Sequence, residues 1–383
     1  MGFQFQSVAS AAPFLSQGLA INYAEIGLLI GLYFLPGALI SLPGGVFIQR
    51  FGDRTICAAG LCLMVAGGCL IGASESFGLA FAGRLISGTG AILLNQVIAK
   101  MATDWFAGLE IVFAMAVVLA SWPFGVALGL ITQPWLGENL GWPIINFTAA
   151  ALCAFALLLV LGSYRAPPGE HSAGESETRG KAAAAALPPP EHIVPMTIAG
   201  AIWASANIGL VLFFSFAPRL LQQFGYSPVA SASWPSTALW IIMLSVPLGG
   251  LAIERDGRPD HAILLCSAVT ALILAVLAIG ISPPLLCVAF GAVMGLPAGA
   301  IMALPARRLG PASRAAGLGV FFTCYYALMT AGPAFAGWLE DRWQSSSAPI
   351  LFAAALFLAI IPSLLLFRRV IGTSLPTPIA IRR

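Results

Sequence analysis

The chain has 383 residues, of which 59% are hydrophobic and only 9% charged, with a mean hydropathy of +0.93 and a formal net charge of +3. Ordinary soluble domains carry about 25% charged residues, so this composition excludes a soluble globular enzyme, a disordered chain and a nucleic-acid-binding protein. Continuous apolar runs of ~20 residues indicate helices that span a lipid bilayer, whereas a β-barrel would alternate over ~10-residue segments. We therefore expect an all-α polytopic membrane protein.

Twelve apolar segments, each long enough to cross a ~30 Å hydrocarbon core, follow one another along the chain. One long connector is rich in Pro, Ala and acidic residues, cannot bury an apolar face and is expected to be a flexible linker. We predict an N-terminal six-helix bundle over 1–164, this linker over 165–194, a C-terminal six-helix bundle over 195–369 and a tail over 370–383. The spans are expected at 1–20, 24–48, 55–74, 78–100, 111–134, 142–164, 195–217, 230–253, 262–281, 283–304, 315–338 and 349–368.

Lys and Arg are distributed unevenly between the two sides of the predicted bundle. The linker, the tail and the even-numbered loops hold fifteen of them, whereas the opposite side holds only Arg219 and Arg342. Loops rich in Lys and Arg stay in the cytoplasm. Both termini and the linker are therefore predicted to be cytoplasmic.

The two halves are related by an internal repeat. A shift of 205 residues superimposes similar segments, in which a span ends near Pro and the next ends in Gly-Gly before a short basic loop. Parallel six-span halves describe a transporter with its binding site between the halves. The matching pairs are Pro13 with Pro218, Gln17 with Gln222, Gly44 and Gly45 with Gly249 and Gly250, Arg50 with Arg255, and Gly52 with Gly257.

Three motifs carry a family resemblance. Gly45-Val-Phe-Ile-Gln-Arg-Phe-Gly-Asp-Arg54 resembles the loop signature G-x3-D-R-x-G-R of the major facilitator superfamily, and Gly250-Leu-Ala-Ile-Glu-Arg-Asp-Gly-Arg258 is its second-half copy. Arg84-Leu-Ile-Ser-Gly-Thr-Gly-Ala91 is similar to the fourth-span motif R-x3-G-x-G. The resemblance covers essentially the whole chain. It implies the two-bundle fold of that superfamily and conformational-switch residues at Gly45, Gln49, Arg50, Gly52, Arg54, Gly250, Glu254, Arg255, Gly257 and Arg258.

The same resemblance implies a non-enzymatic secondary transporter that moves a small-molecule substrate by alternating access. It implies a monomer in a bacterial inner membrane. Two departures stand out. Gln49 replaces an acid that latches one conformation in the family, so we expect a weaker first-half latch, while Glu254 keeps the acid in the second half. The first span is short, and we expect Met1 to lie inside the first helix, which is then truncated at its N-terminus.

Arg84 is the one permanent charge expected deep within a span, because every Asp, Glu and His falls in a loop or near a span end. A buried Arg should face the bundle interior and have a partner. Two interpretations remain open. Arg84 either hydrogen-bonds polar groups of neighbouring helices, or it makes the cavity positive and binds an anion with its planar fork.

Other candidate substrate-binding groups are polar or aromatic side chains within spans, for each of which packing or helix-to-helix hydrogen bonding is the simpler alternative. The seven cysteines lie in apolar runs without the spacing of a metal site or disulfide framework, so we expect no metal and no cofactor. The candidates beside Arg84 are Gln4, Gln6, Tyr33, Asn95, Gln96, Trp122, Trp203, Asn207, Trp240, Tyr325 and Tyr326.

The substrate class follows from the same residues. A core Arg beside amide side chains, with no core acid, favours a small organic or inorganic anion. In its general character, though in no substrate-specific motif, the chain resembles the cyanate and nitrate/nitrite branch of the superfamily. The alternatives are an exporter of lipophilic drug-like compounds, favoured by the aromatic residues, and a non-transporting sensor or scaffold derived from a transporter.

Overall fold

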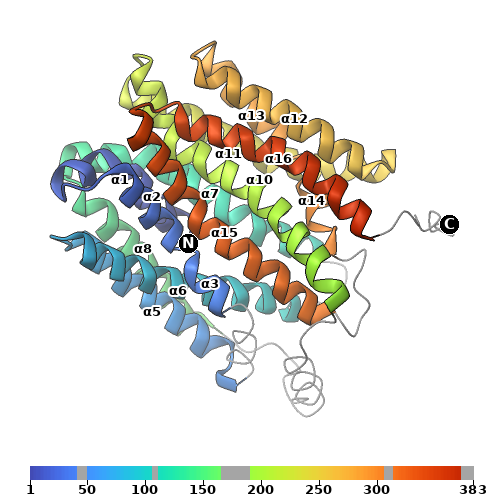
Figure 1. Ribbon diagram of the computed structural model, residues 1–383. Coiled ribbons are helices and arrows are strands. Elements are labelled where there is room, and N and C mark those ends of the chain that lie inside the picture. The colour runs from blue at the N-terminus through green and yellow to red at the C-terminus, as the bar shows by residue number, and fades with distance from the viewer. Residues whose placement is uncertain (41–49, 106–110, 165–189, 306–313, 372–383) are drawn as a thin grey trace.

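The computed structural model describes residues 1–40, 50–105, 111–164, 190–305 and 314–371. Its regular secondary structure is helical throughout these ranges, and long helices run side by side as one bundle (Figure 1). Nine helices in the described ranges are long and apolar enough to cross a bilayer. The prediction of an all-α polytopic membrane protein is confirmed.

The predicted spans of the first half correspond to helices in the same order. The second predicted span is divided between α2 and α3, and residues 41–49 lie outside the described ranges. Met1 lies in the middle of the bundle, where its carbonyl faces the Tyr33 hydroxyl (Figure 1). The helices are α1 (Gly2–Gly18), α2 (Tyr23–Leu32), α3 (Leu35–Ile40), α5 (Asp53–Gly72), α6 (Phe77–Trp105), α7 (Ile111–Leu140) and α8 (Pro143–Ser163).

The second half repeats this arrangement. Its first helix begins at Pro190, inside the predicted linker 165–194, since Pro is well tolerated at the first helical position; residues 165–189 lie outside the described ranges. The helices are α10 (Pro190–Gln223), α11 (Pro228–Asp256), α12 (Pro259–Ala278), α13 (Pro283–Met294), α14 (Ala298–Met302), α15 (Arg314–Trp343) and α16 (Ala348–Ile371).

Two spans that the sequence predicts as continuous helices are broken in the middle. Pro36 has no N–H with which to bond the carbonyl of Leu32, and the chain turns between α2 and α3 through a bond from the Phe34 N–H to the Gly31 carbonyl. Pro297 breaks the tenth span between α13 and α14 in the same way. A helix end inside the bundle leaves carbonyls without intrahelical partners, so each break requires a donor from elsewhere.

The two halves meet along α2 against α15 and α7 against α11. On α2, a Cβ added at Gly27 would lie 2.0 Å from the Pro333 carbonyl oxygen, and one added at Gly31 would lie 2.0 Å from that of Thr330. These helices therefore touch backbone to backbone, which only glycine allows. Between α7 and α11, the Ser236 hydroxyl donates to the Ala127 carbonyl at 3.0 Å.

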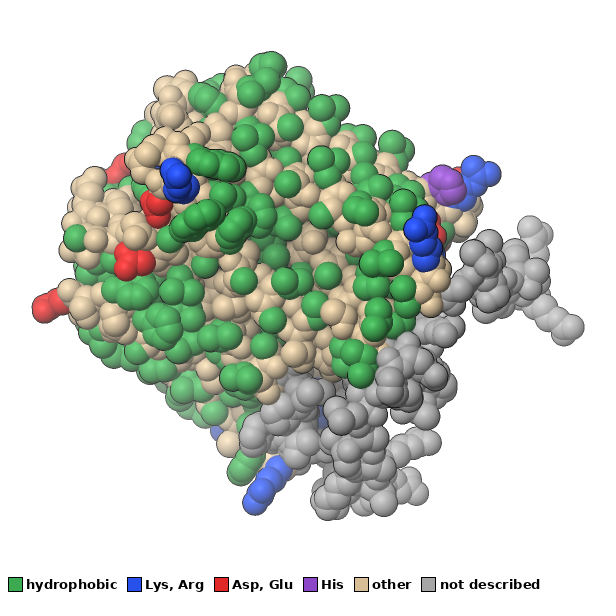
Figure 2. Space-filling view, viewed as in Figure 1, with side chains coloured by type: hydrophobic (Ala, Val, Ile, Leu, Met, Phe, Trp, Pro, Cys, Tyr) green, Lys and Arg blue, Asp and Glu red, His purple; other side chains and the backbone are tan. Residues whose placement is uncertain are grey.

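Charged side chains gather at the two ends of the bundle (Figure 2). We call the end with Glu25, Glu75, Glu138, Glu340 and Asp341 the acidic end, and the end with Arg50, Arg54, Lys100, Arg255 and Arg258 the basic end. The ends agree with the uneven distribution of Lys and Arg along the sequence. Which end faces the cytoplasm stays a prediction.

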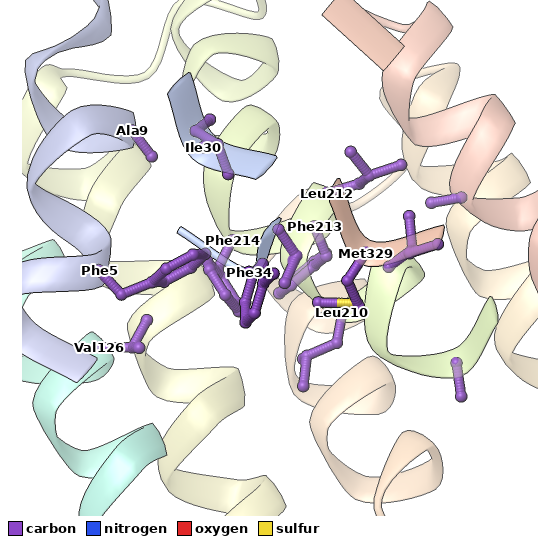
Figure 3. Close-up of a cluster of buried hydrophobic side chains, with 14 of the residues drawn as sticks. Phe5, Ala9, Ile30, Phe34, Val126, Leu210, Leu212, Phe213, Phe214 and Met329 are labelled. Carbon is purple, nitrogen blue, oxygen red and sulfur yellow. The ribbon is translucent and has the colours of Figure 1, made fainter. Parts of the chain in front are cut away.

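An aromatic cluster fills the centre, where the halves meet (Figure 3). Phe5 lies within 6.0 Å, between ring centroids, of Tyr33, Phe34, Trp122 and Phe214. Phe5 and Phe214 are at most 1% exposed. We call these five residues, which come from α1, α7, α10 and the turn after α2, the aromatic plug.

Candidate functional site

A cavity of about 150 Å³ lies at mid-depth between α7 and the second half. We call it the mid-bundle cavity. Trp122 and Trp203 supply aromatic surface, and most of the remaining lining is aliphatic. None of the described residues that line it carries a formal charge.

Three polar side chains of the second half reach the mid-bundle cavity: Asn207 on α10, and Ser267 and Thr270 on α12. The Asn207 amide donates to the Trp203 carbonyl at 2.8 Å, which fixes the orientation of its side chain. Thr270 is 1% exposed, and its hydroxyl has no hydrogen-bond partner among the described residues. A buried polar group without a partner is costly, so the cavity is suited to a ligand that completes this bond.

A second cavity, of about 250 Å³, lies toward the acidic end between α1, α2, α7, α10 and α11. We call it the end cavity. Gln6 on α1 and Ser215 on α10 contribute polar groups to it, Glu138 and Arg219 also line it, and the rest of the lining is mainly apolar.

The aromatic plug separates the two cavities. Along α10, Asn207 and Leu210 line the mid-bundle cavity, Phe214 belongs to the plug, and Ser215 lines the end cavity. Along α7 the order is the same, from Trp122 through to residues 130–138. The cavities therefore lie one behind the other along the helices, with ring contacts closing the path between them.

Beyond the end cavity, polar contacts join the halves at the acidic end. Arg219 on α10 donates to Glu340 on α15 at 2.5 Å and also bonds the Tyr23 hydroxyl at the start of α2. Asp341 accepts hydrogen bonds from the Tyr23 and Ala24 N–H groups at 3.1 and 2.7 Å. A second-half carboxylate thus caps a first-half helix.

The burial of Glu340 is not predicted by the sequence. The eleventh span is expected to end at residue 338, whereas α15 extends to Trp343, and Glu340, near this helix end, is only 3% exposed. An acid near a span end carries no local signal of burial, because its ion-pair partner Arg219 is far away in sequence. A hydropathy window cannot detect such a pair.

Arg84 is completely buried, and its guanidinium bonds backbone carbonyls. It donates to Leu29 at 2.8 Å, Gln4 at 3.2 Å and Phe5 at 2.7 Å. Leu29 lies in the last turn of α2, where the helix break leaves carbonyls without partners, so Arg84 caps that end as basic side chains often do. Its guanidinium also lies 4.5 Å from the ring centroid of Tyr33. Arg84 lines neither cavity, and its role in substrate binding stays a prediction.

Gln4 and Gln6 belong to a buried polar network that also includes residues absent from the sequence-based candidates. The Gln4 amide donates to the Met64 carbonyl at 2.7 Å. The Ser7 hydroxyl donates to the Asn146 side chain at 2.8 Å, and the Gln133 amide donates to the Phe3 carbonyl at 2.6 Å. Single amides in apolar spans are visible in a sequence, but only their orientation separates network members from lipid-facing groups.

The remaining candidates are distributed as follows. Trp122, Trp203 and Asn207 line the mid-bundle cavity, and Gln6 lines the end cavity. Tyr33 lies in the aromatic plug. The Tyr325 ring meets the Tyr326 ring edge to face, and Tyr326 stacks on Phe322. Outside these cavities lie Asn95, which is exposed, Gln96, and Trp240, which packs against Phe124 and is 39% exposed.

The predicted switch residues lie at the basic end, and Gly45 and Gln49 fall outside the described ranges. Arg54 donates to the Leu161 carbonyl at the end of α8 at 2.6 Å. The neighbouring Asp53, which sequence reasoning left without a role, is buried and forms an ion pair with Lys100 at 2.9 Å. Gly52 and Gly257 have positive φ, which favours glycine. The exposed residues are Arg50, Gly52, Arg54, Glu254, Arg255, Gly257 and Arg258, and a Cβ at Gly250 would meet open space.

Comparisons of the sequence and of the structure with known proteins agree on the fold. The sequence model of the family described as Major Facilitator Superfamily matches residues 1–333. The crystal structure of the nucleoside transporter NupG superimposes with a TM-score of 0.73 at 16% identity, over 95% of this chain and 96% of that one. At this identity the likeness concerns the fold alone.

Two curated relatives differ in what their names say they move. The probable nitrate/nitrite transporter NarK2 of Mycobacterium tuberculosis is 26% identical over 332 residues, 80% of each chain. The methylenomycin A resistance protein of Bacillus subtilis is 28% identical over 159 residues, 40% of this chain and 33% of the relative. This chain spans 40% or less of the length of that protein and of two other curated relatives that it matches.

Proposed function

We propose that this chain, which belongs to the major facilitator superfamily, is a secondary transporter that carries a small neutral solute with an apolar body and a hydrogen-bonding group. The observation that carries the proposal is the lining of the mid-bundle cavity. It offers Trp122 and Trp203 for an apolar body and Asn207 and Thr270 for one polar group, with no charged residue among the described lining.

The electrostatics of the bundle support a neutral solute. An ion in an apolar cavity loses its hydration and needs an opposite charge or several hydrogen bonds in return. Arg84 is fully buried, bonds three carbonyls with three of its five N–H donors and lines neither cavity, and Arg219 is paired with Glu340. Neither cation offers an anion a ready partner in this conformation.

A small anion is the second candidate. The match to NarK2 over 80% of both chains favours it, as does the presence of a core Arg. It requires a conformation in which the Arg84 guanidinium, which is fully buried here, lines a cavity. The name of the methylenomycin A resistance protein agrees better with export of an apolar compound.

A thermal-unfolding screen of the purified protein tests the proposal. The panel pairs neutral one-ring alcohols and amides with carboxylates of the same shape. A ligand at 100 times its dissociation constant stabilises the native state by about 2.7 kcal/mol. We expect neutral members to stabilise the protein, and solute counterflow in proteoliposomes to show that the best of them is transported.

Two variants locate the effect in the mid-bundle cavity. Thr270→Val and Asn207→Leu keep the volume but remove a polar group, and they should reduce stabilisation by the neutral ligands. Thr132→Val is the matched control, because the Thr132 hydroxyl is exposed and bonds the Leu128 carbonyl one turn back. Stabilisation by carboxylates alone, unchanged in Thr270→Val, would contradict the proposal and favour the anion.

Location and organisation remain proposals as well. We propose a bacterial inner membrane, with the basic end and both termini in the cytoplasm, because the Lys and Arg distribution follows the usual asymmetry. The domain boundaries 1–164 and 195–369 and the monomeric state belong to the same proposal. Cysteine labelling from each side of the membrane tests the orientation.

A further inference from the structure

The end cavity contains buried polar atoms that no contact within the described chain satisfies. Gln6 is 1% exposed, and its amide nitrogen donates to the Ser10 hydroxyl at 3.2 Å, which leaves its carbonyl oxygen without a partner. Ser215 is 9% exposed, and its hydroxyl also lacks a partner among the described residues. Both residues line the same 250 Å³ cavity, Gln6 from the first half and Ser215 from the second.

Beside Gln6, the side-chain oxygen of Gln133 is a third buried polar atom without a hydrogen-bond partner among the described residues. The Gln133 amide nitrogen is held by the Phe3 carbonyl, so its oxygen is the atom left unpaired. A Cβ added at Gly129 would lie 3.1 Å from both the Gln6 Cβ and the Gln133 nitrogen, which places these side chains next to each other. The two amide oxygens can only accept, whereas the Ser215 hydroxyl can donate as well as accept, so unpaired acceptors outnumber unpaired donors among these groups.

The repeat places these groups where the halves face each other. Ser10 and Ser215 are related by the same 205-residue shift as Pro13 and Pro218, and all four residues line the end cavity. A solute that passes between the halves on its way to or from the aromatic plug would meet both serines.

The charges around the cavity disfavour an anion. Arg219 is neutralised by Glu340, and Glu138 adds a carboxylate to the lining. The remaining lining is mainly apolar, and the volume lies below the roughly 300–1,000 Å³ of typical ligand pockets. These features require a small molecule with an apolar body.

We propose that the end cavity is a second binding site, in which Gln6 and Ser215 receive the hydrogen-bond donor of a small neutral solute such as an alcohol or primary amide. The inference rests on the proposed function in one respect, that the solute also enters the mid-bundle cavity. The site lies on the acidic-end side of the aromatic plug, so each conformational cycle passes the solute from one site to the other.

Isothermal titration of the purified full chain with 2-phenylethanol tests the second site. The wild type should show two binding events. Gln6→Leu and Ser215→Ala should each weaken one event about tenfold, the effect of one lost hydrogen bond, and leave the other unchanged, whereas Thr270→Val should weaken only the other event. Ser16→Ala is the matched control, because the Ser16 hydroxyl bonds the Pro13 carbonyl on the same helix outside the cavity.

The methyl ether of the same alcohol, which keeps the apolar body but cannot donate, should bind the end cavity about tenfold more weakly. A single event that only Thr270→Val weakens would overturn the second site and leave the proposed function intact. A single event that only the Gln6 and Ser215 variants weaken would support this site and overturn the mid-bundle one. Binding that none of these variants alters, or equal binding of ether and alcohol at the end cavity, would overturn the inference.

Discussion

Replacement of Arg84 by methionine is the most informative single perturbation of this fold. The side chain is fully buried, and its guanidinium joins α6 to α1 and α2 through three carbonyls. Methionine has a similar volume, is apolar and has no donor. The variant therefore removes all three bonds and leaves the Leu29 carbonyl, at the broken end of α2, without its partner.

The expected loss in the free energy of unfolding follows from the three hydrogen bonds that the variant removes. Hydrogen bonds from a charged donor contribute about 1.5–3 kcal/mol each, so three amount to about 4.5–9 kcal/mol. Desolvation of the guanidinium offsets several kcal/mol of this gain. A net loss of about 3 kcal/mol in the free energy of unfolding remains, which corresponds to a fall in Tm of about 6 °C at roughly 2 °C per kcal/mol.

Thermal unfolding in detergent, followed by tryptophan fluorescence, measures this loss. Arg54→Met is the matched control, since Arg54 also donates to a carbonyl of another helix, that of Leu161, but from an exposed position. Its Tm should change by no more than about 2 °C, because exposed charge interactions contribute about 0–1 kcal/mol. An Arg84→Met protein as stable as the wild type would refute the idea that Arg84 caps α2, and would make a substrate-binding role the better explanation for a buried Arg.

Three further predictions concern the contacts between the two halves and the aromatic plug that separates the two cavities. Gly31→Ala places a Cβ 2.0 Å from the Thr330 carbonyl oxygen and should lower the Tm markedly. The control Gly250→Ala meets open space and should leave the Tm unchanged or raise it, because alanine favours the helix by up to about 1 kcal/mol. Equal Tm values for the two variants would contradict the close packing of α2 on α15. Phe214→Ala should raise passive solute release from proteoliposomes, because it opens the aromatic plug between the two cavities. The control is Phe155→Ala, at a residue that is 59% exposed. Equal release rates for the two variants would argue against the plug. Asp341→Ala should speed hydrogen exchange at the Tyr23 and Ala24 amides and cost about 1 kcal/mol as a lost helix cap, while Glu75→Ala should change neither.

Much of the architecture could be predicted from local sequence. The number and order of the spans follow from apolar length, because a bilayer of fixed thickness requires about 20 apolar residues per helix. The repeat and the loop motifs indicated the superfamily, which the match over residues 1–333 confirms. The breaks at Pro36 and Pro297 also have a local cause, but a hydropathy window does not register it.

The residues that line the cavities could be predicted only in part. Trp203 and Asn207 line the mid-bundle cavity, whereas Trp240, an equally apolar aromatic in the next helix, faces outward against Phe124. Nothing in the sequence separates these tryptophans. Lipid is as apolar as the protein interior, so a membrane helix has no strong amphipathic pattern from which its rotation could be deduced.

What the sequence by itself determined is therefore the set of helices, their order, and the requirement that a charge such as Arg84 be buried with partners. Only the tertiary structure decided what those partners are: the carbonyls of Gln4, Phe5 and Leu29 together with the Tyr33 ring, rather than an acidic side chain. The same holds for Glu340 with Arg219. Helix formation depends on near neighbours in the chain, whereas the environment of a side chain depends on how distant helices are rotated and packed against one another.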